Sequence, residues 1–229
     1  MDTLKNQIES YSGDQSLIAL KKSLEFSPKV TFSTSFGKED QAITHLIAKN
    51  DLPISIFTLD TGRLFEETYA TFDRTIKKYN LNIQVSSPQT KDVENLMTKK
   101  GPYSFYDSVE NRKECCSIRK IEPLKRSLKG FDIWITGLRS EQSTNRSKME
   151  MVEWDEANQI IKIHPLLNWS SEKLNQFINT NNIPINPLHA KGYPSIGCSS
   201  CTRAIIEGED ERAGRWWWEN TKKECGLHN

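Results

Sequence analysis

Short apolar runs alternate with amphipathic segments along the first half of the chain. The runs are rich in β-branched and aromatic residues, which predicts buried strands, and the segments between them repeat apolar positions every three or four residues, which predicts helices. The predicted strands are residues 30–35, 54–60, 82–87 and 132–137; the helical positions are Ile43, Leu46 and Ile47, then Phe65, Tyr69, Phe72, Ile76 and Tyr79, then residues 111–128.

Strand and helix in alternation predict a fold of the α/β class, with a Rossmann-like, mostly parallel sheet flanked by helices. Beyond residue 137 the pattern changes to a polar loop and then to a β-hairpin over residues 150–163 that turns near residues 155–158. A short helix is expected to begin at Ser170, because a hydroxyl there precedes an acidic first turn. Residues 183–197 contain prolines and glycines and predict an irregular connection.

Composition favours a compact enzyme or binding domain. The 229 residues carry a net charge of +1, with 27% charged and 36% hydrophobic residues, which points neither to a nucleic-acid partner nor to a disordered chain. No segment approaches the ~18 uncharged residues of a membrane span, so we expect a cytoplasmic protein without a membrane partner. The sequence leaves a homo-oligomer open.

Five cysteines divide into four and one. Cys115 and Cys116 are adjacent, Cys198 and Cys201 form a Cys-x-x-Cys motif, and Cys225 stands alone near the end. Two closely spaced pairs suit a tetrahedral zinc ion or an iron–sulfur cluster, because both bind four thiolates. Two disulfides with one spare thiol are less favoured, because such frameworks belong mainly to short secreted chains.

Three loops with small polar residues follow predicted strands, at residues 33–40, 59–63 and 137–143. Parallel sheets bind ligands at the carboxyl ends of their strands, so these loops predict a nucleotide cleft. The first loop lacks the spacing of a Walker loop, and taken alone it is equally an ordinary strand-to-helix turn. The candidate binding residues are Ser33, Ser35, Gly37, Asp40, Leu59, Asp60, Thr61, Gly62, Gly137 and Arg139.

Six motifs together resemble one family over nearly the whole chain. They are SFGKED, LDTGRLFEETY, KECCSIRKIEPL, ITGLRSEQSTNR, GCSSCTRAIIEGEDERAGRWWWE and the terminal KECGLH. The chain is similar in them to the assimilatory sulfonucleotide reductases, which belong to the adenine nucleotide α-hydrolase-like superfamily. The paired cysteines and the terminal motif are specific, whereas the short loop motifs fit many relatives.

The resemblance implies reduction of adenosine 5′-phosphosulfate (APS) to sulfite and AMP. Cys115, Cys116, Cys198 and Cys201 would bind a 4Fe-4S cluster, with zinc as the alternative, and Cys225 would be the catalytic nucleophile. The nucleophile would form a cysteine S-sulfonate that reduced thioredoxin or glutaredoxin resolves. The implied organisation is one nucleotide-binding and iron–sulfur domain over residues 1–215, followed by a flexible catalytic tail over residues 216–229.

Four further residues are candidates for binding the substrate. The resemblance places Arg212, Arg215 and His228 near the sulfate or phosphate groups, where cations would offset negative charge. Lys120 follows Cys116 by four residues, one turn of a continuous helix, which would bring its ammonium near the cluster and the substrate. The alternatives are a surface position for Lys120, an unordered terminal position for His228, and pairing of the arginines with the acidic residues 209–211. We expect the tryptophan run 216–218 to be structural support rather than a base-stacking surface.

The sequence leaves open a second substrate and two other classes of protein. Lys38, in a loop larger than that of many APS-specific relatives, favours a 3′-phosphate, so the 3′-phosphorylated substrate (PAPS) is the second candidate, alone or together with APS. An ATP-dependent thiolation enzyme would need an SGGxDS-type loop, which the sequence lacks. A non-catalytic iron–sulfur sensor would need a DNA-binding element or a basic surface, and the sequence shows no sign of either.

Overall fold

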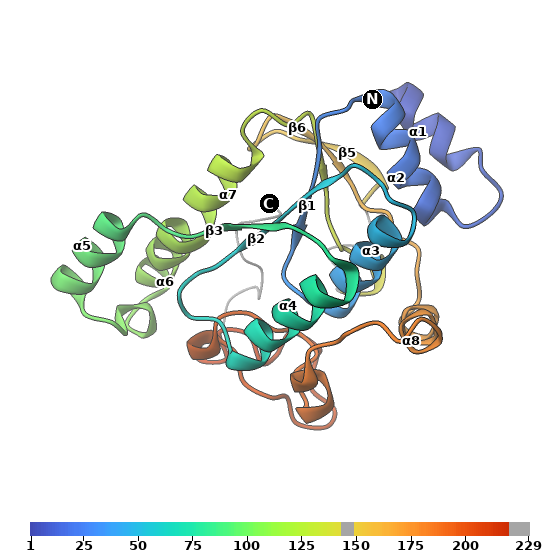
Figure 1. Cartoon of the computed structure of the whole chain (residues 1–229). Helices are drawn as coiled ribbons and strands as arrows, with labels where there is room; N and C mark the ends of the chain where they lie inside the picture. The colour runs from blue at the N-terminus through green and yellow to red at the C-terminus, as the bar shows by residue number, and fades with distance from the viewer. Residues whose placement is uncertain (143–148, 220–229) are drawn as a thin grey trace. The chain divides into compact units, whose positions relative to one another are not determined.

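The structure is a computed structural model that describes residues 1–142 and 149–219 (Figure 1). Its strands are β1 (Val30–Thr34), β2 (Ser55–Leu59), β3 (Ile83–Ser86), β4 (Ile133–Ile135), β5 (Val152–Asp155) and β6 (Ile160–Ile163). Its α-helices are α1 (Asp2–Glu9), α2 (Gln15–Phe26), α3 (Lys38–Lys49), α4 (Glu66–Tyr79), α5 (Thr90–Lys100), α6 (Val109–Cys116), α7 (Glu122–Leu128) and α8 (Ser171–Thr180).

Residue contacts group the chain into two compact units, each made from three stretches of sequence. The first, called the sheet unit below, comprises residues 1–57, 70–84 and 130–186. The second, called the cysteine unit, comprises residues 58–69, 85–129 and 187–229. The chain passes from one unit to the other within β2, β3 and α4.

The strands form one sheet in the order β3-β2-β1-β4-β6-β5. The pairs β1–β4 and β4–β6 are parallel, and β5 joins β6 as an antiparallel edge strand. The predicted α/β class is therefore confirmed, and so is the hairpin predicted over residues 150–163. The antiparallel pair arises because a short turn, rather than a crossover helix, connects β5 to β6.

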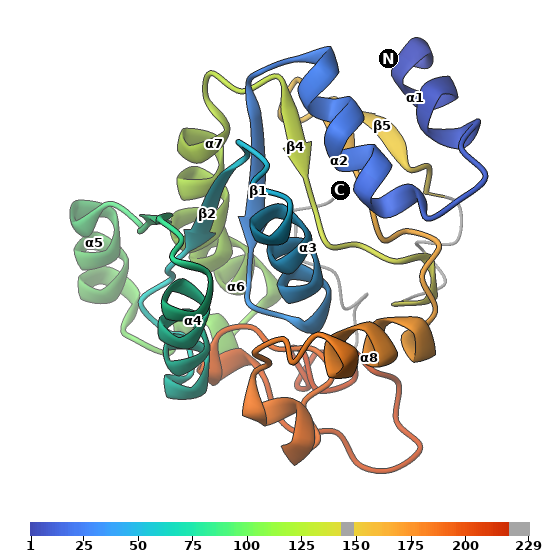
Figure 2. The same ribbon diagram turned by 45° about the vertical axis from the view of Figure 1, so that its right-hand side comes forward.

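One face of the sheet unit's strands is apolar and mainly aliphatic. The register pairs Val30 with Ile133 and Phe32 with Ile135, and all four side chains are buried. Figure 2 shows α2 and α3 beside β1 and β4, and residues of α1, α2, α3 and α8 complete the same core. Burial of this aliphatic face supplies the main driving force for folding the unit.

The opposite face is polar and yet buried. The register aligns Thr31, Trp134, Lys162 and Glu153 in one row across four strands. Lys162 is 3% exposed and makes ion pairs with Asp155 at 2.7 Å and with Glu153 at 3.7 Å. Buried charges need partners of this kind, because an unpaired charge in a protein interior is costly.

Local signals explain where several helices begin. The hydroxyl of Ser170 accepts a hydrogen bond from the backbone N–H of Lys173 at 3.1 Å, which confirms the predicted N-cap of α8. The helix predicted over residues 111–128 is interrupted by a π-helical turn, Ser117–Ile121, between α6 and α7. The helices α1, α2 and α5 were not predicted from the pattern of apolar positions. No helix in the described residues is long and apolar enough to cross a membrane.

Candidate active site

The loop between β1 and α3 is organised by a buried carboxylate. Asp40 accepts hydrogen bonds from the backbone N–H of Ser35 at 2.6 Å and from the Ser35 hydroxyl at 2.7 Å. Burial raises the pKa of Asp40 to about 6, although the hydrogen bonds from Ser35 oppose the shift. Two of the predicted binding residues thus fix each other, and Gly37 occupies the N-cap position of α3 beside them.

The loop after β4 packs directly against this one. A Cβ atom at Gly137 would lie 2.1 Å from Oδ1 of Asp40, so only glycine allows the close approach. Arg139 is 4% exposed, and its guanidinium pairs with Glu39 at 2.9 Å and donates to the carbonyl of Trp169 at 3.2 Å. The structure therefore brings Ser35, Gly37, Asp40, Gly137 and Arg139 together at the carboxyl edge of the sheet unit.

Phe36, in the loop between β1 and α3, and Lys38, the first residue of α3, have different surroundings. Phe36 adopts a positive φ of 60° and stacks on Phe72 with ring centroids 4.9 Å apart. Lys38 donates from its ammonium to the Asn175 side-chain oxygen at 3.0 Å. Its suggested contact with a 3′-phosphate stays a prediction.

The loop at the end of β2 belongs to the cysteine unit and is tied together by Asp60. Its carboxylate accepts hydrogen bonds from the N–H of Gly62 at 2.8 Å and from the hydroxyl of Tyr69 at 2.9 Å. Gly62 has a φ of 68°, which a glycine adopts without strain. Thr61 lies with its hydroxyl 3.3 Å from Sγ of Cys198. This predicted nucleotide loop thus touches the cysteine motif within one unit.

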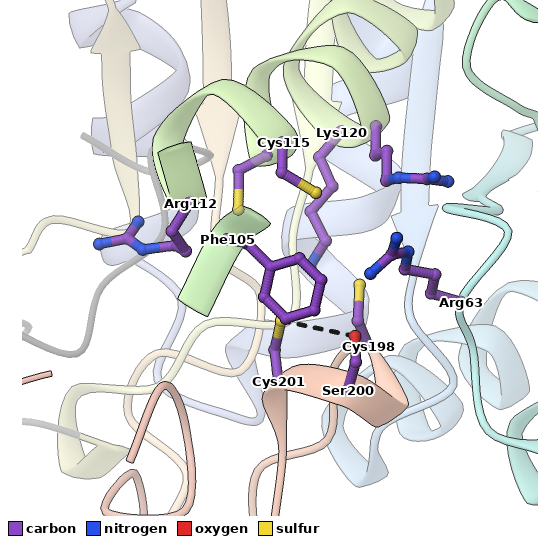
Figure 3. Close-up of a pocket in the computed structure, with 10 residues that line it drawn as sticks. Arg63, Phe105, Arg112, Cys115, Lys120, Cys198, Ser200 and Cys201 are labelled. Carbon is purple, nitrogen blue, oxygen red and sulfur yellow. Dashed lines mark hydrogen bonds between the residues drawn. The ribbon is translucent and has the colours of Figure 1, made fainter. Parts of the chain in front are cut away.

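All four paired cysteines line one pocket of the cysteine unit (Figure 3). Cys115 and Cys116 end α6, Cys198 is the N-cap of the 3₁₀ turn Ser199–Cys201, and Cys201 is the last residue of that turn. All four are free thiols, so the disulfide alternative is wrong for them. Within the described ranges, no three His, Cys, Asp or Glu side chains lie close enough together to be identified as a metal-ion site. The remaining lining residues are Arg63, Phe105, Arg112, Arg119, Lys120 and Ser200.

Burial makes two of the pocket's thiols, Cys115 and Cys201, poor nucleophiles. It raises the pKa of Cys201 to about 12, with the neighbouring Cys198 adding to the shift. It also raises the pKa of Cys115, even though Arg63 and Arg119 act in the opposite direction. Since the thiolate is the reactive form, these two cysteines are suited to holding a metal that displaces their protons and unsuited to attacking a substrate.

Cations surround the cysteines. The π-helical turn directly after Cys116 carries Arg119 and Lys120, and Figure 3 shows the Lys120 side chain extending into the pocket. Arg119 is buried and donates to the carbonyl of Thr61 at 2.6 Å. The guanidinium of Arg63 lies 4.8 Å from the centroid of the Phe105 ring. The positive side chains would offset the charge of metal-bound thiolates.

Two pocket arginines, Arg63 and Arg112, were missed by the sequence analysis. Arg63 is the last residue of the predicted binding loop 59–63, and its place in that loop was the signal that could have identified it. Arg112 forms a buried, two-pronged ion pair with Glu219, with both N–O distances at 2.9 Å. No local spacing could have revealed this pair, because its residues are 107 positions apart.

The predicted arginines after Cys201 have different surroundings. Arg215 is 6% exposed, lies 4.9 Å from the ring centroid of Trp216, and approaches Gly197 so closely that a Cβ there would lie 2.2 Å from its guanidinium. The backbone N–H of Arg212 donates to Asp210 at 2.8 Å. Glu209, one of the acidic residues considered as a partner for the arginines, instead pairs with Arg203 at 2.7 Å. Trp216 is 1% exposed, as expected for structural support, whereas Trp217 of the same run is 39% exposed.

Comparison with known proteins decides the family. The model of the phosphoadenosine phosphosulfate reductase domain matches residues 29–204, which is most of the chain.

The chain belongs to the phosphoadenosine phosphosulfate reductase family.

Relatives within the phosphoadenosine phosphosulfate reductase family are highly similar. The adenosine 5′-phosphosulfate reductase of Allochromatium vinosum is 50% identical over 87% of this chain and 78% of its own. The enzyme of the same name from Agrobacterium fabrum is 49% identical over 87% of this chain and 77% of its own.

Solved structures agree with the family's fold. The phosphoadenylyl-sulfate reductase of Candida auris matches with a TM-score of 0.74 at 26% identity, covering 86% of this chain and 93% of that one. The FMN adenylyltransferase of Candida glabrata, at 16% identity and a TM-score of 0.58, covers all of this chain and 77% of its own and shares the fold alone.

The phosphoadenosine phosphosulfate reductase family model ends before the terminal motif. Cys225 and His228 lie outside the described residues, so their roles stay predictions. The same holds for the binding roles of the loop residues, whose positions are described above. Leu59 ends β2 and is half-buried.

Proposed function

We propose that this protein reduces APS to sulfite and AMP, using electrons from a dithiol protein, as a step of sulfate assimilation. Supporting this proposal, relatives about half identical to the chain over 87% of its length are named adenosine 5′-phosphosulfate reductase. The observation that carries the proposal is that a chain with this similarity also has four free cysteines lining one pocket.

The four pocket cysteines would hold a 4Fe-4S cluster. The donor set fits, because such clusters take four thiolates and the thiols here are free and share one pocket. Four thiolates would also suit a single zinc ion, which is the alternative occupant of this pocket. When bound, the cluster would supply a fixed charge that orients the nearby cations.

Cys225 would carry the reaction. Its thiolate attacks the sulfur of the phosphosulfate group, the bond from that sulfur to the bridging oxygen breaks, and AMP leaves with the bond's electron pair. The product is a cysteine S-sulfonate. A thiolate of thioredoxin or glutaredoxin then attacks Sγ of Cys225 and releases sulfite, and the second thiol of the donor resolves the mixed disulfide. Two electrons from the dithiol thus reduce one sulfate group to sulfite.

The chain's other predicted residues would bind and orient the substrate. Gly37, the loop joined by Asp40 and Gly137, and the loop of Asp60 and Gly62 would hold the nucleotide. The cationic side chains of Lys120, Arg212, Arg215 and His228 would offset the charge that develops on the phosphosulfate oxygens as the bond breaks. Preorganised cations of this kind act only if they are fixed before the reaction begins, and the burial of Arg215 favours such a role.

PAPS is the alternative substrate. The solved relative from Candida auris is named a phosphoadenylyl-sulfate reductase, but at 26% identity it is more distant than the APS-named relatives at about 50%. Lys38 is the residue that would favour a 3′-phosphate, and its hydrogen bond to Asn175 would have to be replaced. We therefore place APS first.

The test is sulfite release from APS and from PAPS by anaerobically purified protein, with reduced thioredoxin and with iron and sulfide measured on the same sample. We expect iron-loaded protein to use APS with the higher kcat/KM. Cys225→Ser should abolish sulfite release while iron content and AMP binding persist. A Cys198→Ser variant should lose iron as well. Sulfite release by Cys225→Ser, or none from an iron-loaded wild type, would contradict the proposal.

A further inference from the structure

The buried polar face of the sheet contains a series of contacts that ends at Ser33. Trp134 lies on β4, and its Nε1 donates a hydrogen bond to Oγ of Ser33 at 2.9 Å. An indole N–H can donate and cannot accept, so the Ser33 oxygen is the acceptor in this bond. Among the residues that the structure describes, Ser33 makes no second side-chain hydrogen bond.

The direction of this bond determines what the Ser33 hydroxyl offers to a ligand. One of its lone pairs is occupied by the indole, while its O–H remains available to donate. Ser33 is half-buried and is the penultimate residue of β1, near the carboxyl edge where sheets of this class bind ligands. The ligand atom that suits the Ser33 hydroxyl is therefore a hydrogen-bond acceptor, such as a phosphate or ribose oxygen.

Lys162 fixes the indole from the next strand. Its ammonium lies 5.1 Å from the centroid of the Trp134 ring, and Trp134 itself is 1% exposed. The ammonium is held in turn by Oδ2 of Asp155 at 2.7 Å. A cation–π contact is stronger in a desolvated site than at the surface, so this contact opposes rotation of the ring.

His164 lies at the far end of the row. Its Nε2 is 3.1 Å from Oε1 of Glu153, and its Nδ1 is 2.6 Å from the Thr136 hydroxyl. His164 is fully buried. Each charged side chain of the row thus has a partner, and the strands β4, β5 and β6 hold the set in register.

Stability alone does not explain this network. A buried ion pair is generally no more stabilising than well-packed aliphatic residues of the same volume, because both charges lose their hydration. The opposite face of the same strands is filled with aliphatic residues. A polar row that ends on a predicted binding residue is better explained by the orientation that it gives to that residue.

We propose that Trp134 is a positioning residue that fixes Ser33 as a hydrogen-bond donor to the nucleotide part of the substrate, and that Lys162 holds the indole in place for this purpose. The inference rests on the proposed function, because it takes an adenine nucleotide as the ligand. AMP is the suitable probe, since it carries the nucleotide part and does not react.

The experiment is a double-mutant cycle read by calorimetric titration with AMP. Trp134→Phe keeps the aromatic ring and removes the N–H, and Ser33→Ala removes the hydroxyl. We expect about 3- to 10-fold weaker AMP binding for Trp134→Phe and at least as large a loss for Ser33→Ala. The double variant should bind no more weakly than Ser33→Ala, because the indole acts only through the hydroxyl.

Trp154→Phe is the matched control. Trp154 is 45% exposed, and its Nε1 donates to Glu156 at 2.7 Å, so the same substitution there should leave AMP affinity unchanged. Urea unfolding of each variant separates loss of folding from loss of orientation. Additive losses in the cycle, or an unchanged affinity in Ser33→Ala, would overturn the proposal. Sulfite release by the wild type tests the proposed reaction separately, so the two can fail independently.

Discussion

The cores of the two units differ in chemistry. The sheet unit is filled with aliphatic side chains from its strands and helices. In the cysteine unit, as far as the structure describes it, three of the six members of the buried cluster are Cys115, Cys198 and Cys201, and the others are Leu96, Phe105 and Trp216. The first core is complete by itself, whereas the second is built largely from side chains that would serve as ligands. The units should therefore respond differently when that chemistry is disturbed.

Removing the proposed cluster should give the largest effect. We expect chelation of iron to lower amide hydrogen-exchange protection across α6 and the Cys198–Cys201 turn by about 10,000-fold or more, because metal binding contributes directly to folding. The strands β1 and β4 should keep their protection, because aliphatic burial stabilises them. Mass-spectrometric exchange measures both regions in one sample.

The control for chelation is Cys225→Ser, measured with and without the chelator. It removes a thiol without removing a proposed ligand. Before chelation, Cys225→Ser should therefore show the same protection pattern as the untreated wild type. Equal loss of protection in both units after chelation would contradict the difference between the cores.

Breaking the buried ion pair of the cysteine unit should have the next largest effect. Arg112→Met leaves the carboxylate of Glu219 buried without its cation, which should lower the free energy of unfolding by about 3–5 kcal/mol. Lys77→Met removes an exposed pair with Asp73 and should cost less than about 1 kcal/mol. Urea unfolding followed by tryptophan fluorescence compares the two, and similar losses would show that the buried pair is not special.

The sheet unit should show a smaller effect that depends on pH. Burial raises the pKa of Asp40 to about 6, so between about pH 4 and 6 the folded chain keeps a proton that the unfolded chain has lost. This contribution to stability is present below pH 4 and is lost as the pH rises to 6, by on the order of 3 kcal/mol.

Asp40→Asn removes this titration. The free energy of unfolding of the variant, measured in urea from pH 4 to 7, should fall less with rising pH than that of the wild type. The Asn side-chain oxygen can still accept from Ser35, so the loop keeps its hydrogen bonds. Parallel pH profiles for the two proteins would rule out Asp40 as the source.

Only part of the fold could be predicted from the sequence. The strands, the hairpin and the N-cap at Ser170 were predicted because their signals are local, within a few residues of each other. The helix α2 was not singled out, although Asp14 caps it with a hydrogen bond to the N–H of Ser16 at 2.9 Å. That signal was present in the sequence and went unused.

Some features of the candidate site could likewise be predicted from the sequence, and others could not. The cysteine pairs were recognisable from their spacing, and the structure places all four around one pocket. Trp134 and Lys162 lie on strands that were predicted, but their contacts with Ser33 and Asp155 depend on the strand order, which the sequence does not specify. The pairing of Arg112 with Glu219 depends on a chain path of more than a hundred residues.

The π-helical turn after Cys116 has a consequence for how this site can change in evolution. A π turn is an α-helix with one residue inserted, and each residue of an α-helix rotates the next by about 100°. Deleting Ser117 or Ile118 would convert the π turn into an α turn and would spare both cysteines of the pair, but it would shorten the spacing from Cys116 to Arg119 and Lys120 by one residue. A single codon deletion could thus change where two of the pocket's cations lie relative to the ligands, so the length of this turn is as much a part of the site as the identity of its residues.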